Sequence, residues 1–336
     1  MSFKRIQPDD FVISSDSISA TLWSNSNPTL ATFYTSSTQE ASSAGNYYLN
    51  IYQTASSNGS AEVQFAIAYA NRYGSGSAWF NPSVAGYSPT RTIYGQYQNL
   101  ILGESSEVFT FGNTTSDDFW VLSIDRTRYK EKLFLNSLAL KLSGSTNVIT
   151  LTDNNQIASS VVFNEAGRVY QLVSGSQGVV YTGSNANGYS NNNGSYGWFL
   201  PDIGTIVLNP QALSESIGLI PSRSVGTIGN NNQRLFRAIS GSSAASFKLN
   251  SEETITSDFI FVRVKNSEFN YSENPSYISG STGEIVHNMF INNPQTYITT
   301  IGLYNDQNNL LATAKLSRPL LKNFTKEALI RIKLDF

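Results

Sequence analysis

"TTIGLYNDQNNLLATAKLSRPLLKN", residues 299–323, contains two short apolar runs joined by a polar turn and followed by a proline. Asn and Asp favour tight turns, and the flanking runs are rich in Ile, Leu and Thr, so the stretch predicts a β-hairpin that turns at "NDQNN" (305–309). Pro319 cannot donate to a strand ladder, which keeps the second strand from being a central one. Strand alternation predicts inward side chains at Ile301, Leu303 and Leu311, and outward side chains at Thr300, Tyr304 and Lys315.

Short strands separated by turns continue along the rest of the chain. "NYYLNIYQ" (46–53) and "AEVQFAIAYA" (61–70) flank a loop that contains Asn-Gly, which predicts a second hairpin. Further β-rich runs recur at the spacing typical of sandwiches and barrels. They are residues 107–113, 118–124, 147–153, 159–165, 168–175, 179–184, 258–266, 296–304, 310–316 and 328–336. The predicted fold class is mainly β, with β-sandwich or barrel-like domains and one or two short helices.

Three stretches carry weaker helical patterns. Asp125 is placed to cap a helix that ends near Asn136. The other two candidate helices are residues 209–220 and 283–292. These helices would be additions to a β framework.

The length of 336 residues exceeds the size at which a single core usually stops growing, so several domains are expected. Asn/Gly/Ser-rich tracts at 184–198, 226–234 and 240–246 do not pack by themselves, and we expect 184–198 to be a long exposed loop. The predicted organisation is an N-terminal arm (1–15), an N-terminal β-rich domain (16–145), a β-rich middle region with long Asn/Gly-rich loops (146–245) and a C-terminal β domain (246–336).

The composition excludes several classes of protein. The 22 basic and 24 acidic residues give a net charge of −2, without the basic footprint of a nucleic-acid binder. No run reaches the roughly 18 apolar residues of a membrane span, and the start "MSFKRIQPDDFVISS" lacks the apolar core of a signal peptide. The absence of cysteine removes disulfides and thiolate zinc sites. We therefore expect a soluble protein that binds neither nucleic acid nor membrane.

Residues able to support catalysis are sparse. His287 is the only histidine, so a Ser-His-Asp triad or a multi-histidine metal centre would depend on it, and we interpret it as an ordinary polar residue on a short helix. The adjacent pairs Asp117–Asp118 and Glu252–Glu253 would point to opposite faces of a strand, which disfavours convergence on one substrate. The oxygen-rich "DNNQ" (153–156) lacks the spacing of a calcium loop and is interpreted as a turn. We expect no enzymatic activity, no metal and no cofactor.

Two sets of side chains are candidates for an interface. Aromatic rings among amides suit sugars and protein interfaces, and they can equally cap the core of a sandwich. Cations beside the C-terminal hairpin can guard an edge strand or steer an acidic partner. The candidate interface residues are Trp79, Phe80, Tyr189, Tyr196, Trp198, Tyr304, Lys315, Arg318 and Lys322.

Both ends of the chain resemble phage proteins. "IGLYNDQNNLLATAKLSRPLLKNFTKEALIRIKLDF" (301–336) resembles the C-terminal pattern of tail and baseplate structural proteins of contractile-tailed phages, where such a hairpin leads to a final strand. "AEVQFAIAYANRYGSGS" (61–77), "SPTRTIYGQYQNLIL" (88–102) and "FWVLSIDRTRYKEKLFLNSLALKLSG" (119–144) resemble virion structural proteins of T-even-like phages that infect cyanobacteria. The middle of the chain, about 145–250, carries no resemblance.

The resemblance implies a place in the virus particle and no activity. A baseplate wedge component of the contractile tail is the preferred assignment, with other tail and baseplate proteins as partners and several symmetry-related copies per particle. Such a bacteriophage protein would be made in the host cytoplasm and act in the virion. Two alternatives stay open: a receptor-binding tail fibre or adhesin that recognises host surface polysaccharide, and a head–tail connector or other tail structural protein. A cell-wall hydrolase would rest only on scattered carboxylates.

Overall fold

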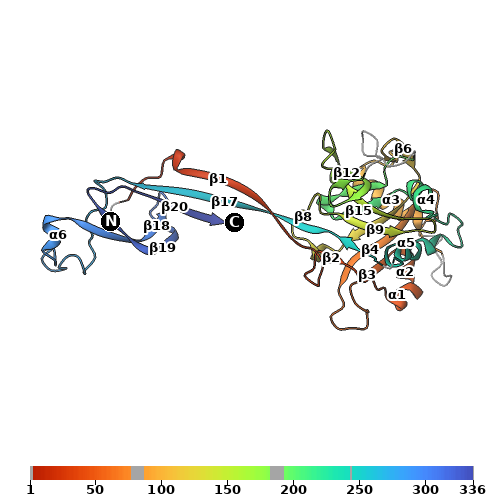
Figure 1. Ribbon diagram of the computed structural model, residues 1–336, viewed down its shortest axis with the longest axis horizontal. Coiled ribbons are helices and arrows are strands. Elements are labelled where there is room, and N and C mark those ends of the chain that lie inside the picture. The colour runs from red at the N-terminus through yellow and green to blue at the C-terminus, as the bar shows by residue number, and fades with distance from the viewer. Residues whose placement is uncertain (1–2, 77–86, 182–192, 243, 336) are drawn as a thin grey trace. The chain divides into compact units, whose positions relative to one another are not determined.

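The computed structural model describes residues 3–76, 87–181, 193–242 and 244–335. It is mainly β, with 41% strand and 18% helix, which confirms the predicted fold class. The chain divides into two compact units, labelled by their elements in Figure 1. Unit 1 consists of Met1–Ser17 and Thr254–Phe336, and unit 2 consists of Ile18–Glu253.

The elements of unit 2 are short strands and helices. The strands are β2 (Thr29–Leu30), β3 (Leu49–Tyr52), β4 (Val63–Asn71), β5 (Phe109–Phe111), β6 (Thr114–Ser116), β7 (Asp118–Ile124), β8 (Lys132–Leu133), β9 (Ala139–Ser143), β10 (Val148–Asp153), β11 (Val162–Asn164), β12 (Gly167–Ser176), β13 (Val179–Val180), β14 (Gly197–Leu200), β15 (Thr205–Leu208) and β16 (Phe247–Lys248). The helices are α1 (Ser37–Ala41), α2 (Ser43–Tyr47), α3 (Thr90–Ile101), α4 (Pro210–Ile217) and α5 (Asn231–Ser240), with 3-10 turns η3 (Arg126–Arg128), η4 (Pro201–Ile203) and η5 (Ile228–Asn230).

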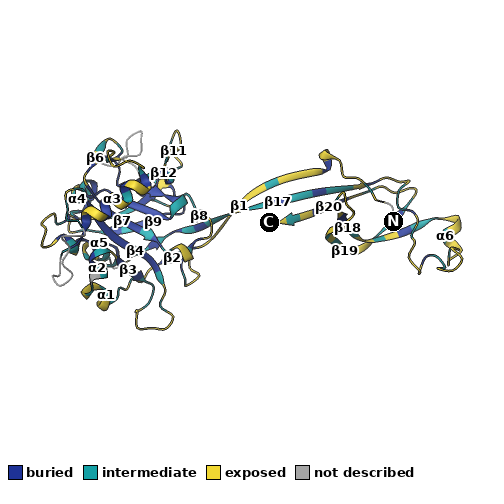
Figure 2. Ribbon diagram, turned by 180° about the vertical axis from the view of Figure 1, so that it is seen from behind, coloured by how far each residue is buried: buried dark blue, intermediate teal, exposed yellow. Residues whose placement is uncertain are grey.

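A 12-stranded antiparallel sheet forms a half-barrel in unit 2. Its order is β2-β16-β9-β10-β12-β14-β15-β7-β4-β3, and β11 and β13 also pair with β12. Central strands are buried on both faces, as the dark blue β4 and β7 show in Figure 2. Successive residues of β7 serve different cores: Trp120 and Leu122 belong to one, Phe119 and Val121 to the other.

Helices cover both faces of this sheet. The larger core takes in Leu213 of α4 and Leu235 of α5, and the smaller core takes in Tyr94 of α3. The β5–β6 hairpin closes the smaller core with Phe109 and Phe111, whose rings contact the ring of Trp198 at centroid distances of 5.5 and 5.4 Å. Burial of the sheet on both faces explains its near-continuous apolar strands.

Unit 1 is a small β-sandwich. The elements are η1 (Pro8–Asp10), β1 (Phe11–Thr21), β17 (Asn250–Val264), α6 (Met289–Asn292), β18 (Gln295–Tyr304), β19 (Leu310–Asn323) and β20 (Ala328–Asp335), and β1 and β17 each continue from one unit into the other. One layer is the sheet β1-β17-β20, and the other is the β18–β19 hairpin. Ile260 of β17 and Ile332 of β20 lie opposite each other and pack against Leu303 of β18.

The predicted C-terminal hairpin is confirmed, with Asn308 in the left-handed region at the turn (φ 61°). Of the side chains predicted to face inward, Leu303 is buried and Ile301 is half-buried, but Leu311 is 68% exposed. Alanines 312 and 314 of β19 take the inward positions instead. The pairing register explains the difference. Leu303 pairs with Ala312, so Ala312 points to the same face as Leu303 and its neighbour Leu311 points to the other face.

A wide bulge divides the hairpin. Ile298 pairs with Leu320 and Thr300 with Lys315, so one residue of β18 lies opposite the four residues 316–319 of β19. Pro319 lies in this bulge, where it displaces no ladder hydrogen bond. The hairpin sheet has two strands, so β19 is not a central strand, as its proline predicts.

One of the three predicted helices forms fully. The side chain of Asn209 caps α4 by accepting from the Gln211 N–H at 3.0 Å, and Gly218 ends it at φ +70°. The helix predicted from Asp125 is wrong: Asp125 caps only η3, and Lys132–Leu133 pairs with β17 as β8. The third prediction reduces to the four residues of α6.

The predicted domain boundaries also need correction. The boundary at 145–146 falls inside the β9–β10 hairpin, whose strands are neighbours in one sheet. Residues 1–15 are not a separate arm, because β1 begins at Phe11 and joins the sheet with β17. The Asn/Gly-rich tract 226–234 contains η5 and the start of α5 at Asn231.

Candidate interaction surface

Ion pairs fix the N-terminal segment of unit 1. Arg263 Nε donates to Asp10 Oδ1 at 2.6 Å, and Lys4 Nζ donates to Glu268 Oε2 at 2.7 Å. The hydrogen bond from Lys4, joined by one from the Lys265 N–H, holds the pKa of Glu268 below its ordinary value. Lys4 and Asp10 are therefore tied to β17 and the loop that follows it.

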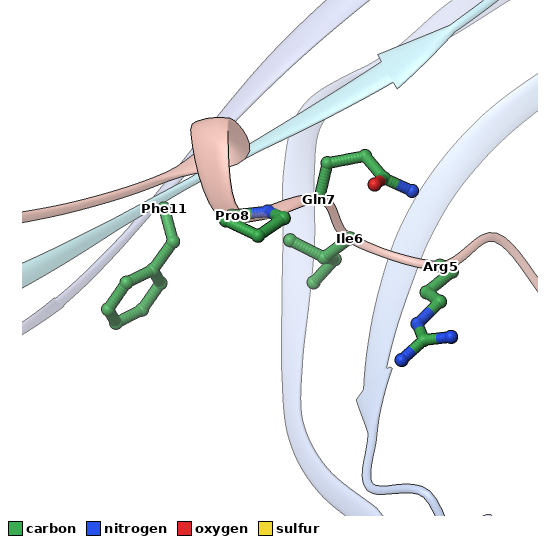
Figure 3. Close-up of a pocket in the computed structure, with 5 residues that line it drawn as sticks. All are labelled: Arg5, Ile6, Gln7, Pro8 and Phe11. Carbon is green, nitrogen blue, oxygen red and sulfur yellow. The ribbon is translucent and has the colours of Figure 1, made fainter.

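Residues of this segment line an open hollow of about 430 Å³. The lining residues are Arg5, Ile6, Gln7, Pro8 and Phe11. In Figure 3 the side chains of Arg5, Ile6 and Phe11 extend from one side of the chain, while Gln7 points to the other. The hollow thus offers apolar surface beside one cation.

Strand β1 continues this apolar surface. Phe11, Val12 and Ile13 are 39, 48 and 62% exposed. Neighbouring residues of a strand point to opposite faces, so both faces of β1 carry uncovered apolar side chains. Figure 2 shows β1 as almost entirely exposed, in contrast to central strands of unit 2 such as β4 and β7.

A buried lysine positions the loop between β17 and β18. Lys322 is fully buried, and its Nζ donates to Asn266 O at 2.8 Å, Asn270 Oδ1 at 2.8 Å and Asn323 O at 3.0 Å. All three ammonium hydrogens therefore have neutral acceptors. Burial lowers the pKa of Lys322, with the nearby carboxylates opposing the shift. This arrangement corrects the prediction that Lys322 is an interface side chain.

The other hairpin candidates lie at the surface. Lys315 and Arg318 are exposed on β19, and Tyr304 is 39% exposed with its ring edge-on to Phe3 at 5.1 Å. These three residues belong to unit 1, as does most of the exposed strand β1. The first half of β1 falls within the predicted N-terminal arm, residues 1–15. The β-branched run at Val12 and Ile13 was the signal for that strand.

The aromatic candidates of unit 2 belong to its interior. Tyr196 is 3% exposed and Trp198 is 8% exposed, and each is part of a hydrophobic core. The exposed loop predicted for 184–198 is therefore wrong from Gly194 onward, where the chain is buried and leads into β14 at Gly197. Trp79, Phe80 and Tyr189 lie outside the described residues.

The carboxylate pairs diverge, as strand alternation predicts. Arg223 binds Asp118 through Nε to Oδ2 at 2.9 Å and Nη2 to Oδ1 at 3.1 Å, while Asp117 lies 3.6 Å from Arg72. The Tyr69 hydroxyl also donates to Asp118, at 2.5 Å, and burial followed by the Asp118 charge raises the pKa of Tyr69 well above its usual range. The carboxylate of this ion pair is buried, whereas the side chain of Arg223 is 54% exposed.

The carboxylates of the second pair, Glu252 and Glu253, also contact two different lysines. Glu252 lies 3.5 Å from Lys132, and Glu253 accepts a hydrogen bond from Lys130 at 2.6 Å. Two carboxylates that each face a separate lysine are not arranged to act on one glycosidic bond.

Asp153 is a buried acid held by backbone donors. Its carboxylate accepts from the N–H groups of Asn136 at 3.0 Å and Asn155 at 3.3 Å. Burial raises its pKa, and the two hydrogen bonds only partly oppose that shift. The "DNNQ" stretch thus ends β10 and starts a turn, as predicted.

The described residues contain no group of three or more His, Cys, Asp or Glu side chains that could hold a metal ion. His287 is exposed just before α6, with its ring edge-on to Phe290 at 5.7 Å. Within the same residues, no helix is long and apolar enough to cross a membrane.

Comparisons with protein-family models, with curated proteins and with solved structures found no match to this chain.

Proposed function

We propose that this protein is a structural subunit of a contractile phage tail, that it acts through contacts with other tail proteins, and that it is a component of the baseplate wedge. The observation that carries the proposal is the exposure of apolar side chains on both faces of β1. The sequence resemblance of both chain ends to phage structural proteins supplies the setting.

An unprotected edge strand favours a role in assembly. Proteins that act alone usually shield such edges with Lys, Pro or a covering element. The sequence of β1, "FVISSDSISAT", contains no Lys or Pro and a single charged residue, Asp16, and the β18–β19 hairpin packs on β17 and β20. Apolar side chains left open in this way typically mark a surface that another protein covers.

The core of unit 1 is small for its apolar content. Among residues 3–17 and 254–335, six apolar side chains are buried: Ile260, Val264, Tyr277, Leu303, Ile330 and Ile332. More large apolar side chains of the same unit are exposed, among them Tyr297, Leu310, Leu311, Phe324 and Leu329. A unit with this balance gains stability when partners cover it, as in interfaces of permanent assemblies.

Among the described residues, the aromatic side chains that suggested glycan binding give no separate candidate function. Tyr196 and Trp198 are enclosed in unit 2. The exposed apolar side chains of unit 1 favour contacts with proteins, which we propose as the function of the molecule.

Electron microscopy of the intact virus tests the proposal. We expect density for this chain at the baseplate, with Phe11, Val12 and Ile13 covered by neighbouring protein. Density elsewhere in the tail would overturn the wedge assignment alone. Absence of the chain from purified virions, shown by mass spectrometry, would overturn the proposal as a whole.

A further inference from the structure

We propose that β1 of one chain pairs edge to edge with β20 of a second copy, so that the unit 1 sheets of several identical chains join into a closed ring. This inference rests on the proposed function for its setting and deepens it by naming the partner. Its test uses the isolated protein in solution, so it can fail independently of any location in the tail.

The two open edges belong to the same sheet. In the order β1-β17-β20, β1 ends the sheet on one side and β20 on the other, and each leaves a row of backbone groups without a strand partner. Joining unlike edges of identical copies uses both at once, and repetition by rotation closes a ring that leaves neither edge open.

The strand directions permit this pairing. β17 and β20 are antiparallel. The ion pair between Asp10, directly before β1, and Arg263, near the end of β17, indicates that β1 also runs antiparallel to β17. β1 and β20 therefore run the same way, and rotation about an axis along the strands brings them together as a parallel pair.

Charge selects unlike edges over like edges. Asp16 is the only charged residue of β1 and lies at its centre, so symmetric pairing of two β1 strands along their full length would set Asp16 opposite Asp16. β20 carries Arg331, Lys333 and Asp335, and Lys333 Nζ lies 2.8 Å from Asp335 Oδ1. Among the described residues, neither Asp16 nor Arg331 forms an ion pair, so each edge keeps one uncompensated charge of opposite sign.

The ring would also cover the apolar side chains of β1. On both faces of the sheet, pairing would place side chains of the neighbouring β20 beside those of β1. Contact with these neighbours removes part of the apolar surface of β1 from water.

Engineered disulfides give a direct test, because the chain has no cysteine of its own. Neighbouring strands place Cα atoms within the distance that a disulfide spans. The full-length chain is prepared as Ser15→Cys, as Lys333→Cys and as the double variant, and each is oxidised mildly and separated under denaturing conditions. We expect the double variant to form a ladder of linked chains that stops at the size of the ring, and a mixture of the two single variants to form linked pairs that contain one chain of each.

The outcomes separate the possible pairings. Pairs formed by Ser15→Cys alone would indicate β1 against β1 and overturn the proposal. An unlinked double variant, together with a monomeric mass of the unmodified chain by light scattering, would overturn it as well. Neither result bears on the proposed place of the protein in the tail, which electron microscopy of the virus tests separately.

Charge reversal provides a second readout. Asp16→Arg would leave both edges basic and should weaken self-association. Ile13→Lys should dissociate the oligomer, whereas the control Val162→Lys, at a 54% exposed valine on β11 of unit 2, should leave its mass unchanged. Equal effects of Ile13→Lys and Val162→Lys would contradict a specific role for β1.

Discussion

The ammonium group of Lys322 donates to the side-chain oxygen of Asn270 at 2.8 Å, deep within unit 1. The bond joins the end of β19 to the loop that follows β17, and Thr296 Oγ1 adds a second link by donating to Phe269 O at 2.6 Å. Lys322 belongs to the C-terminal stretch that resembles phage tail proteins, and it holds the loop after β17 in place.

Replacing Lys322 by methionine should destabilise unit 1. The substitution keeps the length of the side chain but leaves the buried side-chain oxygen of Asn270 and two partly buried carbonyl oxygens without their donor, and we expect a loss of about 1–3 kcal/mol in the free energy of unfolding. Chemical unfolding measures the loss, and hydrogen exchange at Asn270 and Thr296 locates it. Lys326→Met, at an exposed lysine of the following turn, is the control and should change stability by less than about 0.5 kcal/mol. Equal effects of the two substitutions would refute the role of the buried ammonium.

Replacing Arg223 by methionine should destabilise unit 2. The carboxylate of Asp118 is nearly inaccessible and would keep only the hydrogen bond from Tyr69, so we expect a loss of about 1–3 kcal/mol. Arg91→Met, at an exposed arginine of α3, should be close to neutral. A thermal melt in which both variants match the unmodified chain would show that the Arg223 contact is not needed.

The stability of unit 2 should depend on pH through Asp153. Its pKa is higher in the folded chain than in the unfolded one, because burial disfavours the charge. The contribution is complete below the unfolded pKa of about 4 and is lost as pH rises through the folded pKa. We therefore expect the free energy of unfolding of the unmodified chain, relative to Asp153→Asn, to fall with increasing pH across this interval. The difference is obtained from denaturant titrations at several pH values, and a difference that is constant or rises would contradict the assignment.

Replacing Trp198 should act on the core. Trp198→Ala would remove a ring that packs on Phe109 and Phe111, at a cost of about 3–5 kcal/mol in the free energy of unfolding. Trp198→Phe should cost less, because it keeps an aromatic ring and removes an indole N–H that has no hydrogen-bond partner among the described residues. Specific loss of a ligand at unchanged stability in Trp198→Ala would contradict this interpretation.

Local patterns in the sequence account for the parts of the fold that could be predicted. Strands with turn residues between them, such as β3–β4 and β18–β19, form where alternation and Asn-rich turns indicate. Helix α4 carries its cap residues in sequence, at Asn209 and Gly218. These signals depend only on neighbours along the chain.

Secondary structure was missed mainly where contacts between residues far apart in the sequence determine it. Leu133 lies in a helical pattern but pairs with Ser251, more than a hundred residues away. Helix α3 was not predicted because Gly95 interrupts it, although Ile93, Tyr97 and Ile101 lie at helical spacing. Asn231 at the start of α5 reads as a loop residue, yet it is buried and bonds the backbone of Ser222.

The candidate surface was recognised only in part for the same reason. Exposure of Tyr304, Lys315 and Arg318 follows from the hairpin pattern, but burial of Lys322 depends on acceptors from residues 266 and 270. The exposed strand β1 became an interface candidate only when the sheet order placed it at an edge.

The bulge at residues 316–319 shifts the side-chain phase of the hairpin. Leu303 and Ala312 face the β17–β20 sheet on one side of the bulge, whereas Thr296 and Lys322, on the other side, have their buried positions against the loop after β17. Leu303 and Thr296 are seven residues apart on β18, so strand alternation alone places them on opposite faces. Their partners Ala312 and Lys322 follow them because the bulge takes up three additional residues of β19. One short ribbon thus serves two different neighbours, while its proline stays outside the paired positions.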